Sequence, residues 1–165
     1  ARQVVLERAA QYEMDQTYIP VEGTLDLLHT LKAHHIPTAL VTSGAMWKVN
    51  TVTEQLGLAG LFAAIVTSDD ISHSKPHPEG YLTGARKLGK TPQRCIVFED
   101  ALSGVEAARA AGAACVGVNR AAQAEALCQA GACCVIPTLA AARLERTPAG
   151  LSLALAGSGT LWLAG

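Results

Sequence analysis

The sequence predicts an α/β fold in which helices cover both faces of a doubly wound parallel sheet. Short apolar segments alternate with longer amphipathic segments along most of the chain. Continuous apolar strands are typical of parallel sheets, because such strands are buried on both faces. The length of 165 residues matches one domain, and a content of 50% hydrophobic and 16% charged residues excludes intrinsic disorder.

Five short apolar segments are predicted to be the strands of this sheet. They occupy residues 36–41, 63–67, 95–98, 114–118 and 133–136. Apolar residues at helical spacing predict the helices, at residues 3–15, about 23–35, 46–56, 78–88, 101–111 and 121–130. Pro20 ends the first helix, and Gly57, Gly89 and Gly112 end three later ones. In the tail, the apolar residues 151–155 and 160–163 flank a glycine-containing turn and predict a β-hairpin.

The charge balance argues against nucleic acid and membranes as partners. Thirteen Lys and Arg residues against fourteen Asp and Glu residues give a net charge of −1, which provides no broad basic surface for polyanions. Aromatic residues make up only 4% of the chain, too few to predict a surface on which bases stack. After Arg146 the chain is uncharged, but Pro148 and several glycines interrupt this tail, so we expect no membrane span.

The five cysteines, at positions 95, 115, 128, 133 and 134, are an odd number and lie mostly in apolar segments. We interpret them as buried, reduced thiols of a cytoplasmic protein. A metal site at Cys128, Cys133 and Cys134 is the alternative, although their spacing matches no common zinc pattern.

Polar residues follow three of the predicted strands, at the edge where parallel sheets bind ligands. Thr42, Ser43 and Gly44 follow the first strand and precede a helix, so their hydroxyl and N–H groups can hold an anion. A plain helix N-cap is the alternative interpretation of these residues. Lys75 follows the second strand in a proline-rich segment, and a solvated surface lysine is the alternative there.

Two adjacent carboxylates, Glu99 and Asp100, follow the third strand. Carboxylate oxygens suit Mg²⁺, a hard ion, whereas the alternative is that Asp100 caps the next helix. An anion site, a counter-charge and a metal site are together the parts that phosphoryl transfer requires.

Three segments of the chain resemble signature segments of a known family, the haloacid dehalogenase superfamily, in its branch of sugar-phosphate phosphatases and β-phosphoglucomutase. The segments are Val41-Thr42-Ser43-Gly44, Ser74-Lys75-Pro76-His77-Pro78 and Val97-Phe98-Glu99-Asp100-Ala101-Leu102-Ser103-Gly104-Val105. The resemblance covers about residues 3–137. It implies that Thr42, with Ser43 and Gly44, binds the transferring phosphoryl group and that Lys75 neutralises it. It further implies that Glu99 and Asp100 hold Mg²⁺, directly or through water, and that the substrate is a small phosphorylated metabolite such as a sugar or polyol phosphate.

One signature segment of that family is absent from the sequence. It is a strand ending in Asp-x-Asp-Gly-Thr, whose first Asp is the nucleophile and whose second Asp is the general acid and base. Val21-Glu22-Gly23-Thr24-Leu25 looks similar, but it has Glu for Asp and is expected to open a helix. In family members the missing strand lies between the strands that here end at Val41 and Phe98.

We therefore expect a piece of a longer phosphatase: residues 1–18 as the remnant of a helical cap, 19–146 as the core and 147–165 as an apolar tail. A non-catalytic remnant or phosphate-binding module is an alternative. A phosphosugar mutase is a second alternative, but Gly44-Ala45-Met46 offers no side-chain donor for a second phosphate, which favours a phosphatase.

Overall fold

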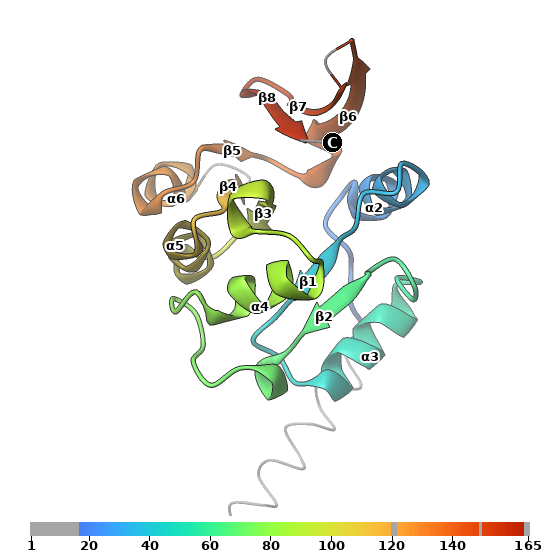
Figure 1. The fold of residues 1–165 in the computed structure, drawn as a ribbon, viewed down its shortest axis with the longest axis vertical. Coiled ribbons are helices and arrows are strands. Elements are labelled where there is room, and N and C mark those ends of the chain that lie inside the picture. Colours follow the sequence, from blue (N-terminus) through green and yellow to red (C-terminus); the bar gives the residue numbers. More distant parts are fainter. Residues whose placement is uncertain (1–16, 120–121, 149, 164–165) are drawn as a thin grey trace, which may run out of the picture.

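The computed structural model describes residues 17–119, 122–148 and 150–163, and within them the strands form three sheets (Figure 1). Two sheets are parallel: one pairs β1 (Ala39–Val41) with β2 (Ala64–Val66), and the other has the order β3 (Ile96–Glu99), β4 (Ala114–Val118), β5 (Cys134–Ile136). The third is antiparallel, with β6 (Ala142–Thr147), β7 (Gly150–Leu155) and β8 (Gly159–Leu163) in that order.

The helices alternate with the parallel strands, which confirms the predicted α/β class. They are α2 (Thr24–Ala33), α3 (Met46–Gln55), α4 (Glu79–Lys87), α5 (Leu102–Ala111) and α6 (Ala124–Ala130), with 3₁₀ turns η1 (Ser68–Asp70), η2 (Pro92–Arg94) and η3 (Leu139–Ala141). The helix predicted at 3–15 lies outside the described residues. None of the described helices is long and apolar enough to cross a membrane.

The sheet β3–β4–β5 is buried on both faces, as its apolar strands predict. Val97, Cys115 and Val135 face the helices, where Val105 and Ala108 of α5 and Leu127 of α6 cover them. The alternate residues contact α2 and the antiparallel sheet, in a cluster that contains Leu27, Val116, Ile136, Ala142, Leu153 and Leu155. The antiparallel sheet is therefore part of the hydrophobic core. Full burial of each such Val, Leu or Ile side chain contributes roughly 1.5–3 kcal/mol to the stability of the folded state.

The predicted hairpin is present as β7 and β8, but a third strand, β6, precedes it and was not predicted. In β6 the apolar Ala142 and Leu144 alternate with the charged Arg143 and Glu145, which is the pattern of a strand with one face in solvent. That alternation was the available signal. The antiparallel sheet therefore begins at Ala142.

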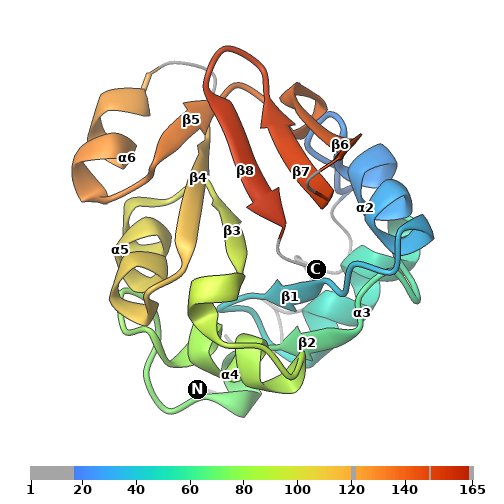
Figure 2. The same ribbon diagram turned by 45° about the horizontal axis from the view of Figure 1, so that its top comes forward.

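A gap in the strand pairing separates the two parallel sheets, which Figure 2 shows as separate units. Among the described strands, β1 pairs with β2 and β3 pairs with β4, so each of β1 and β3 has one edge without a strand partner. The segment Val21–Leu25 does not fill this gap, because Thr24 is already the first residue of α2.

The cysteines correct one expectation from the sequence. All five are free, and Cys115 is buried, but Cys128 and Cys133 are exposed, so they are not the buried thiols that were predicted. Cys128 lies on the solvent side of α6, and Cys133 precedes β5. Within the described ranges, Cys128, Cys133 and Cys134 do not converge as a group of metal ligands.

Candidate active site

The centre of the site is a contact between Lys75, in the loop before α4, and Glu99, the last residue of β3. The Lys75 ammonium donates to Oε1 of Glu99, and the two side chains are only 17% and 8% exposed. The alternative of a solvated surface lysine is therefore wrong for Lys75. Its Nζ also lies 4.9 Å from the centre of the Tyr81 ring, which adds a cation–π contact.

Four donors surround the carboxylate of Glu99. Oε1 accepts hydrogen bonds from Lys75 and, at 2.5 Å, from the Tyr81 hydroxyl, whereas Oε2 accepts from the backbone N–H groups of Asp100 at 3.1 Å and Ala101 at 3.3 Å. Burial acts to raise the pKa of Glu99, but the hydrogen bonds from Lys75 and Tyr81 outweigh it and hold the pKa below its usual value. The same burial, together with the neighbouring Glu99 charge, raises the pKa of Tyr81.

Asp100 follows Glu99 and is exposed. The N-cap of α5 is Ala101, and no side chain caps this helix, so the capping alternative for Asp100 is wrong. An exposed carboxylate at the end of a parallel strand suits a hard cation such as Mg²⁺. Glu99 fits a direct metal bond less well, because both of its oxygens already accept two hydrogen bonds and Lys75 contacts one of them.

Thr42, Ser43 and Gly44 connect the end of β1 to α3. The hydroxyl of Thr42 accepts a hydrogen bond of 3.0 Å from the N–H of Gly44, and Ser43 is exposed. The N-cap of α3 is Ala45, without a side-chain cap, so Thr42 and Ser43 are not N-caps.

Asp69 is a residue of this region that the sequence interpretation missed. Its Oδ2 accepts a hydrogen bond of 3.1 Å from the N–H of Met46, the first residue of α3. A carboxylate there binds to the positive end of the helix and joins η1 to the Thr42 loop. The available signal was two acidic residues, Asp69 and Asp70, which follow the predicted strand at 63–67 after one serine.

The structure thus brings two of the predicted residues, Lys75 and Glu99, into direct contact. Asp100 lies beside them in sequence at the end of β3, whereas Thr42, Ser43 and Gly44 lie at the end of β1. Among the described residues, the side chain of Thr42 makes no hydrogen bond to Lys75 or Glu99.

This arrangement matches a known family over most of the chain. The sequence profile described as "Haloacid dehalogenase-like hydrolase" matches residues 1–118. The chain belongs to the haloacid dehalogenase-like hydrolases. The predicted family resemblance is confirmed, and the two parallel sheets with their helices agree with the Rossmann-like core of the solved structures in this family.

The chain is similar in sequence to two proteins named as phosphatases and in structure to a hydrolase of the same family. Validoxylamine A 7'-phosphate phosphatase of Streptomyces hygroscopicus subsp. limoneus is 41% identical over 112 residues, which are 68% of this chain and 53% of that protein. Hexitol phosphatase A of Escherichia coli is 41% identical over 99 residues, 59% of this chain and 44% of that protein. A haloacid dehalogenase family hydrolase of Deinococcus radiodurans, solved with bound phosphate and sodium, has a TM-score of 0.71 at 29% identity and covers 84% of this chain and 62% of that one. The chain thus spans about half the length of the curated relatives that it matches.

Proposed function

We propose that this chain is the core part of a Mg²⁺-dependent phosphatase that hydrolyses a small phosphomonoester, such as a sugar or polyol phosphate. The observation that carries the proposal is the buried Lys75–Glu99 pair, with the exposed Asp100 directly beside it. A lysine held by a buried carboxylate at this sheet edge is positioned to offset the charge of a phosphoryl group. The relatives named as phosphatases support the same reaction class.

The residues of the site have three proposed roles: binding the phosphoryl group, neutralising its charge and holding Mg²⁺. The hydroxyls of Thr42 and Ser43 donate to the phosphoryl oxygens, the N–H of Gly44 holds the Thr42 hydroxyl in place, and Lys75 neutralises the phosphoryl charge. Asp100 is the residue that would hold Mg²⁺, which supplies positive charge at the phosphoryl group when bound. Glu99 fixes the position of Lys75 and contributes to the metal through water, since its oxygens are already hydrogen-bonded.

The nucleophile in this proposal is an Asp on a strand that these 165 residues do not supply. Attack by its carboxylate on phosphorus forms an aspartyl-phosphate and breaks the bond to the alcohol oxygen, which takes a proton from the second Asp of the Asp-x-Asp-Gly-Thr segment. The same Asp then removes a proton from water, which attacks phosphorus and releases inorganic phosphate and the free carboxylate. Two observations support this: the sequence has no Asp-x-Asp-Gly-Thr segment, and β1 and β3 each have an edge without a partner strand in the described structure.

The alternatives are a binding module that retains the phosphate pocket without turnover, and a mutase. Gly44, Ala45 and Met46 carry no side-chain donor for a second phosphate, which favours hydrolysis over phosphoryl transfer within a sugar. The five free cysteines favour a reducing compartment such as the cytoplasm. A near-neutral charge favours a small metabolite over nucleic acid or a membrane surface as the partner.

The test compares two proteins with p-nitrophenyl phosphate and sugar phosphates in the presence of Mg²⁺. One is the 165-residue chain, and the other is a chimera in which a strand ending in Asp-x-Asp-Gly-Thr and a helical cap precede Ala1. We expect turnover from the chimera and none from the chain. Turnover by the chain itself would overturn the assignment of the nucleophile. A folded chimera that binds phosphate without turnover would favour the binding module.

A further inference from the structure

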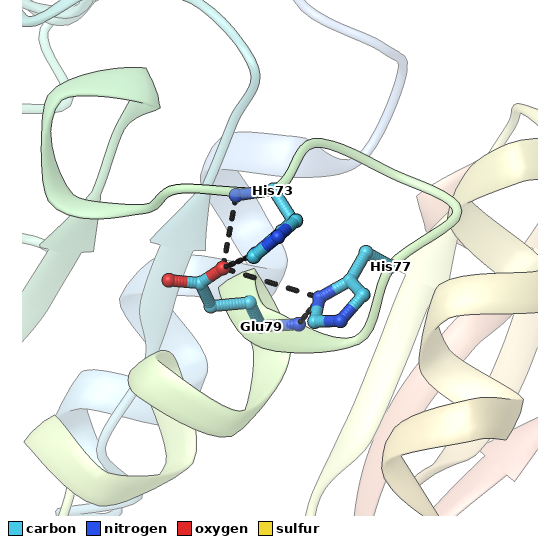
Figure 3. A group of neighbouring side chains, drawn as sticks. All are labelled: His73, His77 and Glu79. Atoms are coloured by element: carbon cyan, nitrogen blue, oxygen red, sulfur yellow. Dashed lines mark hydrogen bonds and ion pairs between the residues drawn. The ribbon is translucent and has the colours of Figure 1, made fainter.

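A second cluster of potential ligands lies on the loop that carries Lys75. Figure 3 shows His73 and His77 of this loop beside Glu79, the first residue of α4. One ring nitrogen from each histidine and one carboxylate oxygen of Glu79 lie within 4.8 Å of one another. In the part of the chain that the structure describes, no other group of three His, Cys, Asp or Glu side chains converges in this way.

The backbone holds these three residues together. Glu79 accepts hydrogen bonds of 2.9 Å from the N–H groups of Ser72 and His73, so its carboxylate ties the loop to the start of α4. The N–H of His77 donates to the carbonyl of Ser74 at 3.0 Å, which closes a turn between the two histidines. Their ring centroids are therefore only 4.5 Å apart. Ligands that are already gathered lose little conformational freedom when an ion binds.

We propose that His73, His77 and Glu79 form a binding site for a divalent transition metal ion of the Zn²⁺ class. Two imidazoles and one carboxylate are a common zinc ligand set, and three protein ligands leave one position for water. Ligands at about 2.0–2.2 Å from a common ion lie no more than about 4.4 Å apart, so the cluster needs only a small contraction. His73 and His77 are 65% and 50% exposed, so solvent and ions reach both rings.

The ion would replace contacts that already exist. His73 Nδ1 lies 2.9 Å and His77 Nδ1 lies 3.9 Å from Oε2 of Glu79. Imidazole nitrogen selects Zn²⁺ and similar ions over Mg²⁺, which prefers oxygen, so this site is chemically distinct from the proposed Mg²⁺ site at Asp100.

The site has a consequence for Lys75, which lies between its two histidines in sequence. A metal ion bound to His73 and His77 would join the two sides of the turn that presents Lys75 to Glu99. We expect this loop to exchange its amide hydrogens more slowly when the ion is bound. The site does not depend on the proposed phosphatase function, because none of its three ligands is among the residues assigned above to phosphate or Mg²⁺.

The test is titration of the complete 165-residue chain with Zn²⁺ by calorimetry, and with Co²⁺ by absorption spectroscopy. We expect one ion per chain at this site and a Co²⁺ spectrum without thiolate-to-metal charge transfer. The double variant His73→Ala/His77→Ala should weaken binding by more than about 100-fold, since even indirect ligand partners contribute 10–100-fold. Both histidines are exposed, so thermal melting of the metal-free variant should match that of the parent chain.

The matched control is His29→Ala/His34→Ala, which removes two exposed imidazoles from α2 and its C-cap and leaves the cluster intact. We expect this control to bind Zn²⁺ as the parent does. Equal affinity of the His73→Ala/His77→Ala variant and the parent would overturn the proposal. Thiolate charge transfer in the Co²⁺ complex would overturn it as well, since it would assign the ion to the exposed Cys128 or Cys133.

Discussion

The carboxylate of Glu99 occupies the space where a side chain of Gly104 would be. A Cβ atom on Gly104 would lie 2.1 Å from Cδ of Glu99 and 2.2 and 2.3 Å from its two oxygens. Gly104 lies in the first turn of α5, so its missing side chain lets this helix approach the end of β3 closely. In this position Oε2 of Glu99 also accepts hydrogen bonds from the N–H groups of Asp100 and Ala101.

Gly104→Ala should therefore destabilise the protein, although alanine is the better helix former. Displacing the carboxylate breaks at least one charge-assisted hydrogen bond, which contributes about 1.5–3 kcal/mol. The gain in helix propensity returns about 1 kcal/mol. We expect the free energy of unfolding in urea to fall by about 0.5–2 kcal/mol, the difference between these two magnitudes.

Ser103→Ala is the matched control for this substitution, because it changes the preceding residue of the same turn. It should leave the free energy of unfolding within about 0.5 kcal/mol of the parent, as surface substitutions usually do. If Gly104→Ala were as stable as Ser103→Ala, the close packing of Glu99 against α5 would not contribute to stability.

Lys75→Met should raise the pKa of Glu99. In the parent, burial raises this pKa and the hydrogen bonds from Lys75 and Tyr81 lower it further than burial raises it. Without the ammonium the balance shifts toward burial, so the pKa should move upward. A carbon-detected NMR titration of the Glu99 carboxyl measures it directly, in the chain as it stands.

The same change has a defined effect on stability. A depressed carboxyl pKa stabilises the folded state above the unfolded pKa, and this contribution is lost as the pH falls through the folded pKa. Lys75→Met should therefore lower the melting temperature at pH 7 more than at pH 3. Lys90→Met, an exposed lysine after α4, should change neither the Glu99 pKa nor the melting temperature. An unchanged Glu99 pKa in Lys75→Met would show that the Lys75 ammonium does not stabilise the ionised carboxylate of Glu99.

The fold was largely predictable because its parallel strands are short, apolar and buried on both faces. The contact between Lys75 and Glu99 was harder to predict, since 24 residues separate them in the sequence and the contact depends on tertiary packing, including that of α4 against α5. The sequence motifs predict that Glu99 and Asp100 hold Mg²⁺ directly or through water, and the structure adds a contact that the motifs did not predict, the hydrogen bond from Lys75 to Glu99. The residue types identified the chemistry of the site, but the choice of partner depended on tertiary geometry.

The ion pair of Asp70 with Lys87 is a second contact between residues that lie far apart in the sequence. Lys87, the last residue of α4, donates to Oδ1 of Asp70 and to the carbonyl of Ile65, both at 2.8 Å. Asp70 also accepts from the N–H and hydroxyl of Thr67. The hydrogen bond from Lys87 and that from the Thr67 backbone lower the pKa of Asp70 to about 2.

Asp70→Asn should therefore be destabilising in a pH-dependent way. The ionised Asp70 stabilises the folded state above its ordinary pKa of 3.8, and this contribution disappears as the pH falls through about 2. The parent should melt at a higher temperature than Asp70→Asn at pH 6, and the difference should shrink toward pH 2. Lys87→Met should reduce the same difference. A difference that stayed constant from pH 6 to pH 2 would show that the charge of Asp70 does not contribute.

Substitutions of Glu99 and Asp100, the two adjacent acidic residues at the end of β3, should change different properties of the enzyme. Asp100 is exposed and caps no helix, so its carboxylate is available to a cation. The carboxylate of Glu99 is occupied by Lys75, Tyr81 and two backbone N–H groups. Mg²⁺ takes only one or two protein carboxylates and keeps several waters, so one direct ligand from this segment is sufficient.

In the active chimera, Asp100→Asn should raise the Mg²⁺ concentration needed for half-maximal activity by more than about 10-fold, because a direct ligand contributes more than an indirect one. Glu99→Gln should instead lower kcat by releasing Lys75, with a smaller change in the Mg²⁺ requirement. Titrating Mg²⁺ against activity for the two variants side by side separates these effects. An unchanged Mg²⁺ midpoint in Asp100→Asn, with a raised midpoint in Glu99→Gln, would reverse the assignment and make Glu99 the direct ligand.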